Sequence, residues 1–93
     1  MKYTVICHPR AESELATAYL AAADPKAVTS ASWIIERILQ ESPEAFGESR
    51  TGQLRVGFEP PLAVWYSISQ PDHLVLIVSF RLFEPGQTGR SRS

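Results

Sequence analysis

The chain has 93 residues, of which 44% are hydrophobic and 20% charged, and its formal net charge is −1 with an isoelectric point near 6.1. A chain of this size is expected to form one domain around one modest hydrophobic core. The balanced charge argues against a protein that binds nucleic acid through bulk positive charge, although it is compatible with a small local basic patch.

The sequence also lacks the patterns of a secreted or membrane protein. No apolar run is long enough to span a bilayer, and the first residues are too polar for a signal peptide. Cys7 is the single cysteine, so no internal disulfide can form. We found no glycine-rich phosphate loop and no metal-ligand spacing, and therefore expect a cytoplasmic protein without cofactor or metal.

The first half of the chain predicts one strand and two helices. Residues 2–8 alternate with apolar side chains on both faces, which predicts a strand buried inside the sheet. Pro9 begins a helix that extends to residue 23. Asp24 is a capping residue for a second helix, from residue 25 to about 42, which Pro43 ends.

The second half predicts a sheet. Residues 44–52 form a polar loop with Phe46 as its apolar anchor. Residues 53–83 contain three apolar runs separated by two short proline-containing breaks, which is typical of an antiparallel meander. The third run is apolar on both faces, so we expect it to be central. Residues 1–84 would form the single domain, and residues 85–93, rich in Gly, Ser and Arg, a disordered tail.

These elements predict an α+β fold with the order β-α-α-β-β-β. A two-helix hairpin would pack on one face of a mainly antiparallel sheet and leave the other face partly open. Strict alternation in the last strand would place Arg81 on the same face as Val75, Ile77 and Ser79. Arg55 projects from the first strand of the meander, and whether it shares a face with Arg81 depends on the strand register.

Several short motifs follow one another along the chain. They are P-R-A-E-S-E-L in the first helix, G-E-S-R before the meander, L-R-V-G and V-W-Y-S-I within it, and L-V-L-I-V-S-F-R in the last strand. Their order over residues 2–83 resembles that of the RelE/ParE superfamily of type II toxin–antitoxin toxins. The resemblance implies an antitoxin partner, and one of two activities. RelE-like members cut mRNA in the ribosomal A site, whereas ParE-like members inhibit DNA gyrase.

The nuclease activity would place three arginines at the catalytic site. RNA cleavage by 2′-hydroxyl attack needs a base, cations that stabilise the phosphate, and an acid for the leaving oxygen. Arginine suits the phosphate because its fork binds two oxygens at once. The resemblance matches Arg55 and Arg81 to family arginines, and Arg50 lies in the loop nearby. Each could instead form an ordinary surface ion pair.

Two departures from the nuclease pattern leave the activity open. Ala63 stands where RelE-like nucleases commonly have an arginine, while Phe83 and Glu84 stand where many have a His or Tyr acid. We therefore consider three hypotheses: a ribosome-dependent mRNA endonuclease, an inhibitor of DNA gyrase, and a degenerate toxin that only binds its antitoxin.

Overall fold

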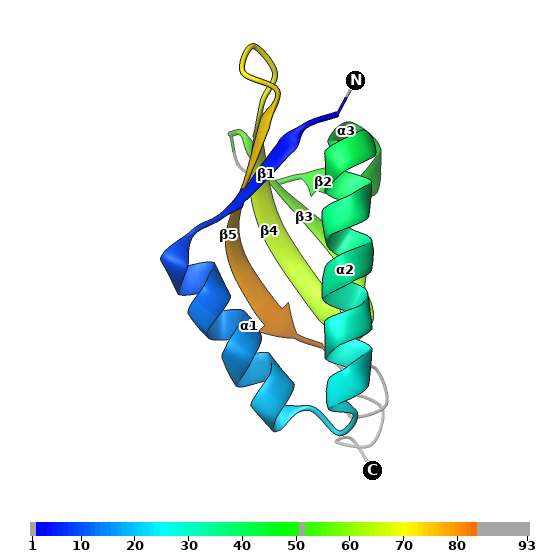
Figure 1. The fold of residues 1–93 in the computed structure, drawn as a ribbon. Coiled ribbons are helices and arrows are strands. Elements are labelled where there is room, and N and C mark those ends of the chain that lie inside the picture. Colours follow the sequence, from blue (N-terminus) through cyan, green and yellow to red (C-terminus); the bar gives the residue numbers. More distant parts are fainter. Residues whose placement is uncertain (1, 51, 84–93) are drawn as a thin grey trace.

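The structure is a computed structural model that describes residues 2–50 and 52–83. The elements in chain order are β1 (Thr4–Cys7), α1 (Pro9–Ala21), α2 (Pro25–Glu41), α3 (Pro43–Phe46), β2 (Glu48–Ser49), β3 (Leu54–Glu59), β4 (Leu62–Ser69) and β5 (Leu74–Leu82). The predicted α+β fold is confirmed, with α3 and β2 as short additions inside the expected polar loop (Figure 1). The expected tail, residues 85–93, lies outside the described residues.

The five strands form one sheet in the order β1-β5-β4-β3-β2. β1 runs parallel to β5, and all other neighbours are antiparallel. The prediction that β1 lies inside the sheet is wrong, because β1 is an edge strand. Its second apolar face is not buried: Ile6 is 46% exposed, while Val5 and Cys7 pack against the core. β5, which the sequence predicts to be central, has a neighbour on each side, although the middle strand of the sheet is β4.

Both long helices pack on one side of the sheet, as predicted (Figure 1). α2 lies over β1, β3 and β4, whereas α1 follows β5. The expected cap is present, since Asp24 Oδ1 accepts a hydrogen bond from the Lys26 N–H at 3.2 Å. No helix within the described residues is long and apolar enough to cross a membrane. We call the side beneath the helices the covered face and the opposite side the open face.

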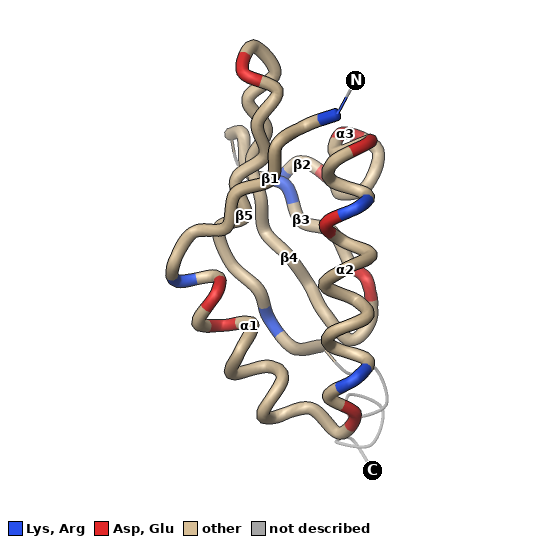
Figure 2. The backbone as a smooth tube through the Cα atoms, viewed as in Figure 1, with Lys and Arg blue, Asp and Glu red and all other residues tan. Residues whose placement is uncertain are grey.

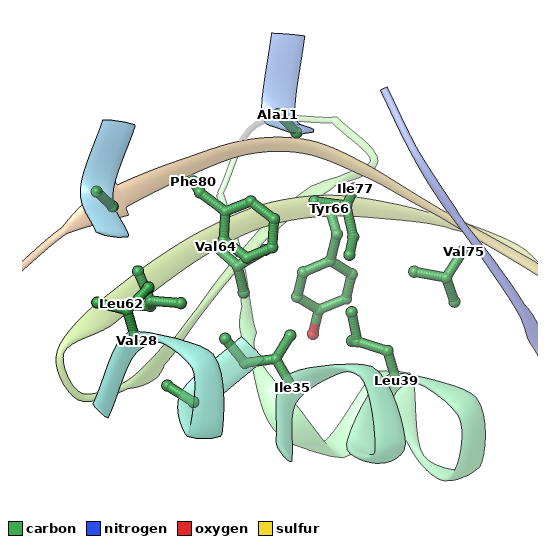
Figure 3. Close-up of a cluster of buried hydrophobic side chains, with 12 residues drawn as sticks. Ala11, Val28, Ile35, Leu39, Leu62, Val64, Tyr66, Val75, Ile77 and Phe80 are labelled. Carbon is green, nitrogen blue, oxygen red and sulfur yellow. The ribbon is translucent and has the colours of Figure 1, made fainter. Parts of the chain in front are cut away.

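Tyr66 lies in the centre of the hydrophobic core on the covered face. Its ring is fully buried and points from β4 toward α2, where Ile35 and Leu39 meet it (Figure 3). Phe46 of α3 stacks on Tyr66 with the ring centroids 6.2 Å apart. A Cβ at Gly57 would collide with the Phe46 ring, so this position in β3 must be glycine for Phe46 to fit. The prediction of Phe46 as an anchor is confirmed.

The register of β5 changes within the strand. Ser79 pairs with Trp65 and Ile77 pairs with Tyr66, so Val78 is an extra residue without a partner on β4. Such a β-bulge rotates all following side chains to the other face. Phe80 consequently joins Val75 and Ile77 in the core. The face assignment predicted from strict alternation is therefore wrong from Ser79 onward.

Candidate functional site

Arg55 lies on the covered face, where it pairs across the sheet with the buried Tyr66. Its Nη2 donates hydrogen bonds to the backbone carbonyls of Glu44, at 2.8 Å, and Gly47, at 2.9 Å. These carbonyls lie in α3 and directly after it, and so short a helix leaves its C-terminal carbonyls without intrahelical donors. Arg55 therefore supplies hydrogen bonds that hold α3 against the sheet.

Tyr66 holds the same short helix by its hydroxyl group. The hydroxyl donates to the Pro43 carbonyl at 2.7 Å and accepts from the Gly47 N–H at 2.8 Å. A Cβ on Gly47 would lie only 2.6 Å from the Val56 carbonyl oxygen, so the close approach requires glycine. Arg55 and Tyr66 together make the start of the G-E-S-R segment a docked element rather than a free loop.

Arg81 lies on the open face, because the bulge at Val78 has rotated the end of β5. Its exposed guanidinium group stands over the ring of Trp65, with the guanidinium carbon 5.8 Å from the ring centroid. Within residues 2–50 and 52–83, no carboxylate lies within ion-pair distance of Arg81. Most of its hydrogen-bonding capacity is therefore available to a bound molecule.

The three predicted arginines do not converge on one site. Arg50 follows β2, with an exposed side chain and a backbone N–H that donates to the Leu54 carbonyl at 2.8 Å. Arg55 and Arg81 lie on opposite faces of the sheet. The strand register, which the sequence left open, pairs Arg55 with Tyr66 and turns it toward the helices, so Arg55 does not share the open face with Arg81.

The open face carries apolar side chains around Arg81. Ala63 pairs with Arg81 across the sheet, so an arginine at position 63 would stand beside it on the same face. The Ala63 methyl group is buried instead. The Phe83 ring contacts the Phe58 ring in a tilted arrangement with the centroids 5.8 Å apart, and both rings are about half exposed. Glu84, named with Phe83 in the sequence comparison, lies outside the described residues.

Figure 2 shows how unevenly charge is distributed. Many charged positions lie along the helices, and β3 has Arg55 and Glu59, whereas β4 has none and β5 has Arg81 alone. Near this arginine, Glu14 of α1 accepts hydrogen bonds from Ser79 Oγ at 2.7 Å and from the Phe80 N–H at 3.0 Å. The hydrogen bond from Ser79 is the main reason that the pKa of Glu14 is lowered. Glu14 thus satisfies a backbone donor of β5 beyond the end of β1.

A second polar cluster, which the sequence did not reveal, joins three distant segments. Glu44 of α3 accepts hydrogen bonds from the Tyr3 hydroxyl, at 2.9 Å, and from Gln70 Nε2. The pKa of Glu44 is lowered, first by its own backbone N–H and then by Tyr3, and the same contact raises the pKa of Tyr3. The cluster connects the start of β1, α3 and the β4–β5 turn, and we therefore assign its residues a structural role.

An apolar groove runs between the two long helices, which diverge from their connecting turn (Figure 1). Its larger part has a volume of about 460 Å³. A second part extends toward β1 and shares Glu12, Leu15 and Ser32 with the first. At the ends of the groove, Leu20 is 82% and Trp33 69% exposed, so large apolar side chains border it without a cover.

The groove is acidic and chemically unreactive. Its charged lining residues are Glu12 and Glu36, with no lysine or arginine among them. Cys7 lies at its inner end, where burial, followed by the two carboxylates, raises the pKa of the thiol. A thiol held protonated is a poor nucleophile. Among the described residues, no group of His, Cys, Asp and Glu is arranged to hold a metal ion.

Comparisons with known proteins identify the fold. No family model matches the chain, and no curated protein matches it by sequence. Solved structures do match. A chain of the toxin–antitoxin complex RelBE2 from Mycobacterium tuberculosis superimposes with a TM-score of 0.74 and 16% identity, over 88% of this chain and 99% of that one. A chain of the ParDE system from P. aeruginosa gives 0.59 and 15%, over 88% and 97%.

The isolated RelE toxin from E. coli also matches, with a TM-score of 0.59 and 12% identity, over 97% of this chain and 94% of that chain. These structures cover almost the whole chain, so the protein has the RelE/ParE fold. At such low identity the likeness concerns the backbone arrangement, and side-chain roles must be argued from this chain's own residues.

Proposed function

We propose that this protein is the toxin of a type II toxin–antitoxin pair, and that it arrests growth by binding a protein target rather than by cutting RNA. The toxin assignment is supported by the shared RelE/ParE fold, together with the ordered sequence motifs. A fold alone does not determine an activity, so the choice between binding and cleavage depends on the arginines and their neighbours.

The observation that carries the choice is the separation of Arg55 from Arg81. Phosphate stabilisation would need several cations and an acid–base pair around one phosphorus atom. Here the hydrogen bonds of Arg55 go to backbone carbonyls of α3 and the residue after it. Ala63 stands where an arginine would flank Arg81, and Phe83 has an apolar ring where a nuclease would have an acid. On β4 and β5, the open face carries one arginine among aromatic, aliphatic and serine side chains, a composition that suits a protein-binding surface.

RNA cleavage is the second candidate, and it is favoured by the guanidinium of Arg81, which forms no ion pair among the described residues. In that case Arg81 would contact the scissile phosphate. The other two predicted catalytic arginines would have to reach it from elsewhere, Arg50 from the end of β2 and Arg55 by leaving its contacts with α3 on the covered face. The target of a binding toxin would be DNA gyrase, as in ParE-like members, and that of a nuclease would be mRNA on the ribosome.

The partner that silences the toxin would be a small antitoxin, and the groove between α1 and α2 suits it. An amphipathic helix could place its apolar face on Leu15 and Leu20. Basic residues beside that face would meet Glu12 and Glu36 across the rim. A neighbouring gene that encodes a short protein with such a segment and a DNA-binding domain would support this assignment.

The test is expression of the chain without an antitoxin, followed by two measurements on the same cells. We expect growth arrest with altered plasmid supercoiling and unchanged ends of ribosome-associated mRNA. New mRNA ends within codons would overturn the binding mechanism in favour of cleavage. Vigorous growth despite soluble protein would leave only the degenerate, antitoxin-binding hypothesis.

Purified components separate the targets further. Gyrase supercoiling should be inhibited by the wild-type protein and by the Arg37→Gln variant, which removes an exposed charge on α2. It should be much less inhibited by Arg81→Gln. If excess protein leaves supercoiling unaffected, gyrase is not the target.

A further inference from the structure

A hollow on the open face surrounds the Trp65–Arg81 pair. It has a volume of about 290 Å³ and is lined by Leu54, Trp65, Val78, Ser79 and Arg81. The bulge explains its shape, because it brings the consecutive residues Val78 and Ser79 to the same depression. The walls are mostly hydrocarbon, which suits an apolar side chain of a ligand.

The guanidinium of Arg81 is positioned at the rim of this hollow. It stands over Trp65, a contact that restricts the arginine side chain before any ligand arrives. Glu14 of α1 interacts electrostatically with Arg81, but no ion pair is formed within the described residues, and its carboxylate binds Ser79 Oγ and the Phe80 N–H. Arg81 is therefore a fixed, exposed cation beside an apolar depression.

The charge and the ring arrangement decide between an acidic peptide and a nucleic acid. Affinity for a phosphate backbone accumulates over several cations, whereas β4 and β5 contribute Arg81 alone to this face. Base stacking needs an open aromatic face, and Arg81 lies over that of Trp65. A peptide needs only one carboxylate at the arginine and one apolar side chain in the hollow.

We propose that this hollow binds an acidic, apolar segment of a partner protein, with an Asp or Glu carboxylate on Arg81 and a Leu- or Trp-sized side chain against Leu54, Trp65 and Val78. This inference rests on the proposed function, because it gives the chemistry by which the open face recognises a protein target. It concerns a surface separate from the groove between the helices.

The probe is a short capped peptide in which Asp alternates with Leu around one Trp, and its matched control has Asn for every Asp. Binding is followed by the indole N–H resonances of the ¹⁵N-labelled protein. The two tryptophans report separate surfaces, Trp65 the open face and Trp33 the helical side. We expect the acidic peptide to shift Trp65 and not Trp33. The Asn peptide should bind about tenfold more weakly, since a charged partner is lost.

Two variants complete the experiment. Arg81→Gln should weaken the acidic peptide about tenfold, whereas Arg37→Gln should bind it like the wild type. Unchanged unfolding curves show that both variants are folded. Equal affinity for the Asp and Asn peptides, no shift at Trp65, or a shift at Trp33 alone would overturn the inference. A single-stranded oligouridylate that shifts Trp65 more strongly than the peptide would also overturn it, in favour of RNA.

The result separates this inference from the proposed function. If the peptide binds as expected but Arg81→Gln still arrests growth, the peptide site is supported and its role in toxicity is rejected. If the peptide does not bind while gyrase is still inhibited, the proposed function is supported and the acidic, apolar peptide is rejected as the ligand of the hollow.

Discussion

Two arginines of the same meander lie on opposite faces of the sheet and make different contacts. On the covered face, Arg55 donates to two backbone carbonyls and so forms part of the scaffold. On the open face, Arg81 stands over Trp65 with no ion pair among the described residues. The residue type is identical, and the difference comes from strand register alone. An arginine that a motif suggests as functional must therefore be placed on a face before it is given a role.

The strongest test of the covered face is Tyr66→Phe. The change leaves the Pro43 carbonyl and the Gly47 N–H buried without their partner, and each should cost about 1–3 kcal/mol. We expect the free energy of unfolding to fall by about 2–6 kcal/mol in urea denaturation. Tyr19→Phe, at an exposed site of α1, is the control and should have little effect. A loss as small as that of the control would show that α3 is not held by the hydroxyl.

Arg55→Ala should have the next largest effect. Hydrogen bonds from a charged donor to the Glu44 and Gly47 carbonyls are lost, and we expect about 1.5–3 kcal/mol of destabilisation. Hydrogen exchange should quicken around residues 43–47, because α3 is released. Wild-type stability in this variant would mean that Arg55 is free for another task, and the nuclease hypothesis would gain support.

The corresponding test of the open face is Arg81→Ala. Only an exposed contact with Trp65 is removed, so stability should fall by at most about 1 kcal/mol. Growth arrest should nevertheless be lost. The reverse pattern, a large loss of stability with toxicity intact, would exchange the roles that we assign to the two arginines.

The smallest expected effect concerns Glu14. Its pKa is lowered in the folded state, so its ionisation stabilises the protein above the ordinary glutamate pKa. That contribution is lost as the pH falls through the lowered value. The stability difference between wild type and Glu14→Gln should stay below about 1 kcal/mol at neutral pH, because solvent screens the contact, and should narrow in acid. Ser79→Ala should reduce the pH dependence, and a difference that widens in acid would contradict the assignment.

Much of the fold could be predicted from local sequence. Pro9, Asp24–Pro25 and Pro43 mark the helix ends, and the meander follows from its apolar runs. The edge position of β1 could not be predicted, because two apolar faces look the same whether the second is buried or exposed. Its pairing with β5 depends on contacts far apart in the chain.

The face on which Arg81 lies was harder to predict, because it depends on one extra residue in β5. Without the bulge at Val78, Arg81 would share the covered face with Val75 and Ile77, as strict alternation predicts. No residue type in L-V-L-I-V-S-F-R marks the bulge. The hydrogen bonds from Arg55 to the α3 region could not be predicted either. They depend on a helix of four residues, which lies in a segment whose sequence is typical of a polar loop.

The pairing of β1 with β5 has a consequence for the order of folding. β3, β4 and β5 are joined by short turns and can pair as soon as they are present, whereas β1 must bridge almost the whole domain to reach its partner. The loop that this contact closes contains both long helices and the rest of the sheet. We therefore expect the first strand of the chain to join last. Until it does, the adjacent edge of β5 is open to other extended segments.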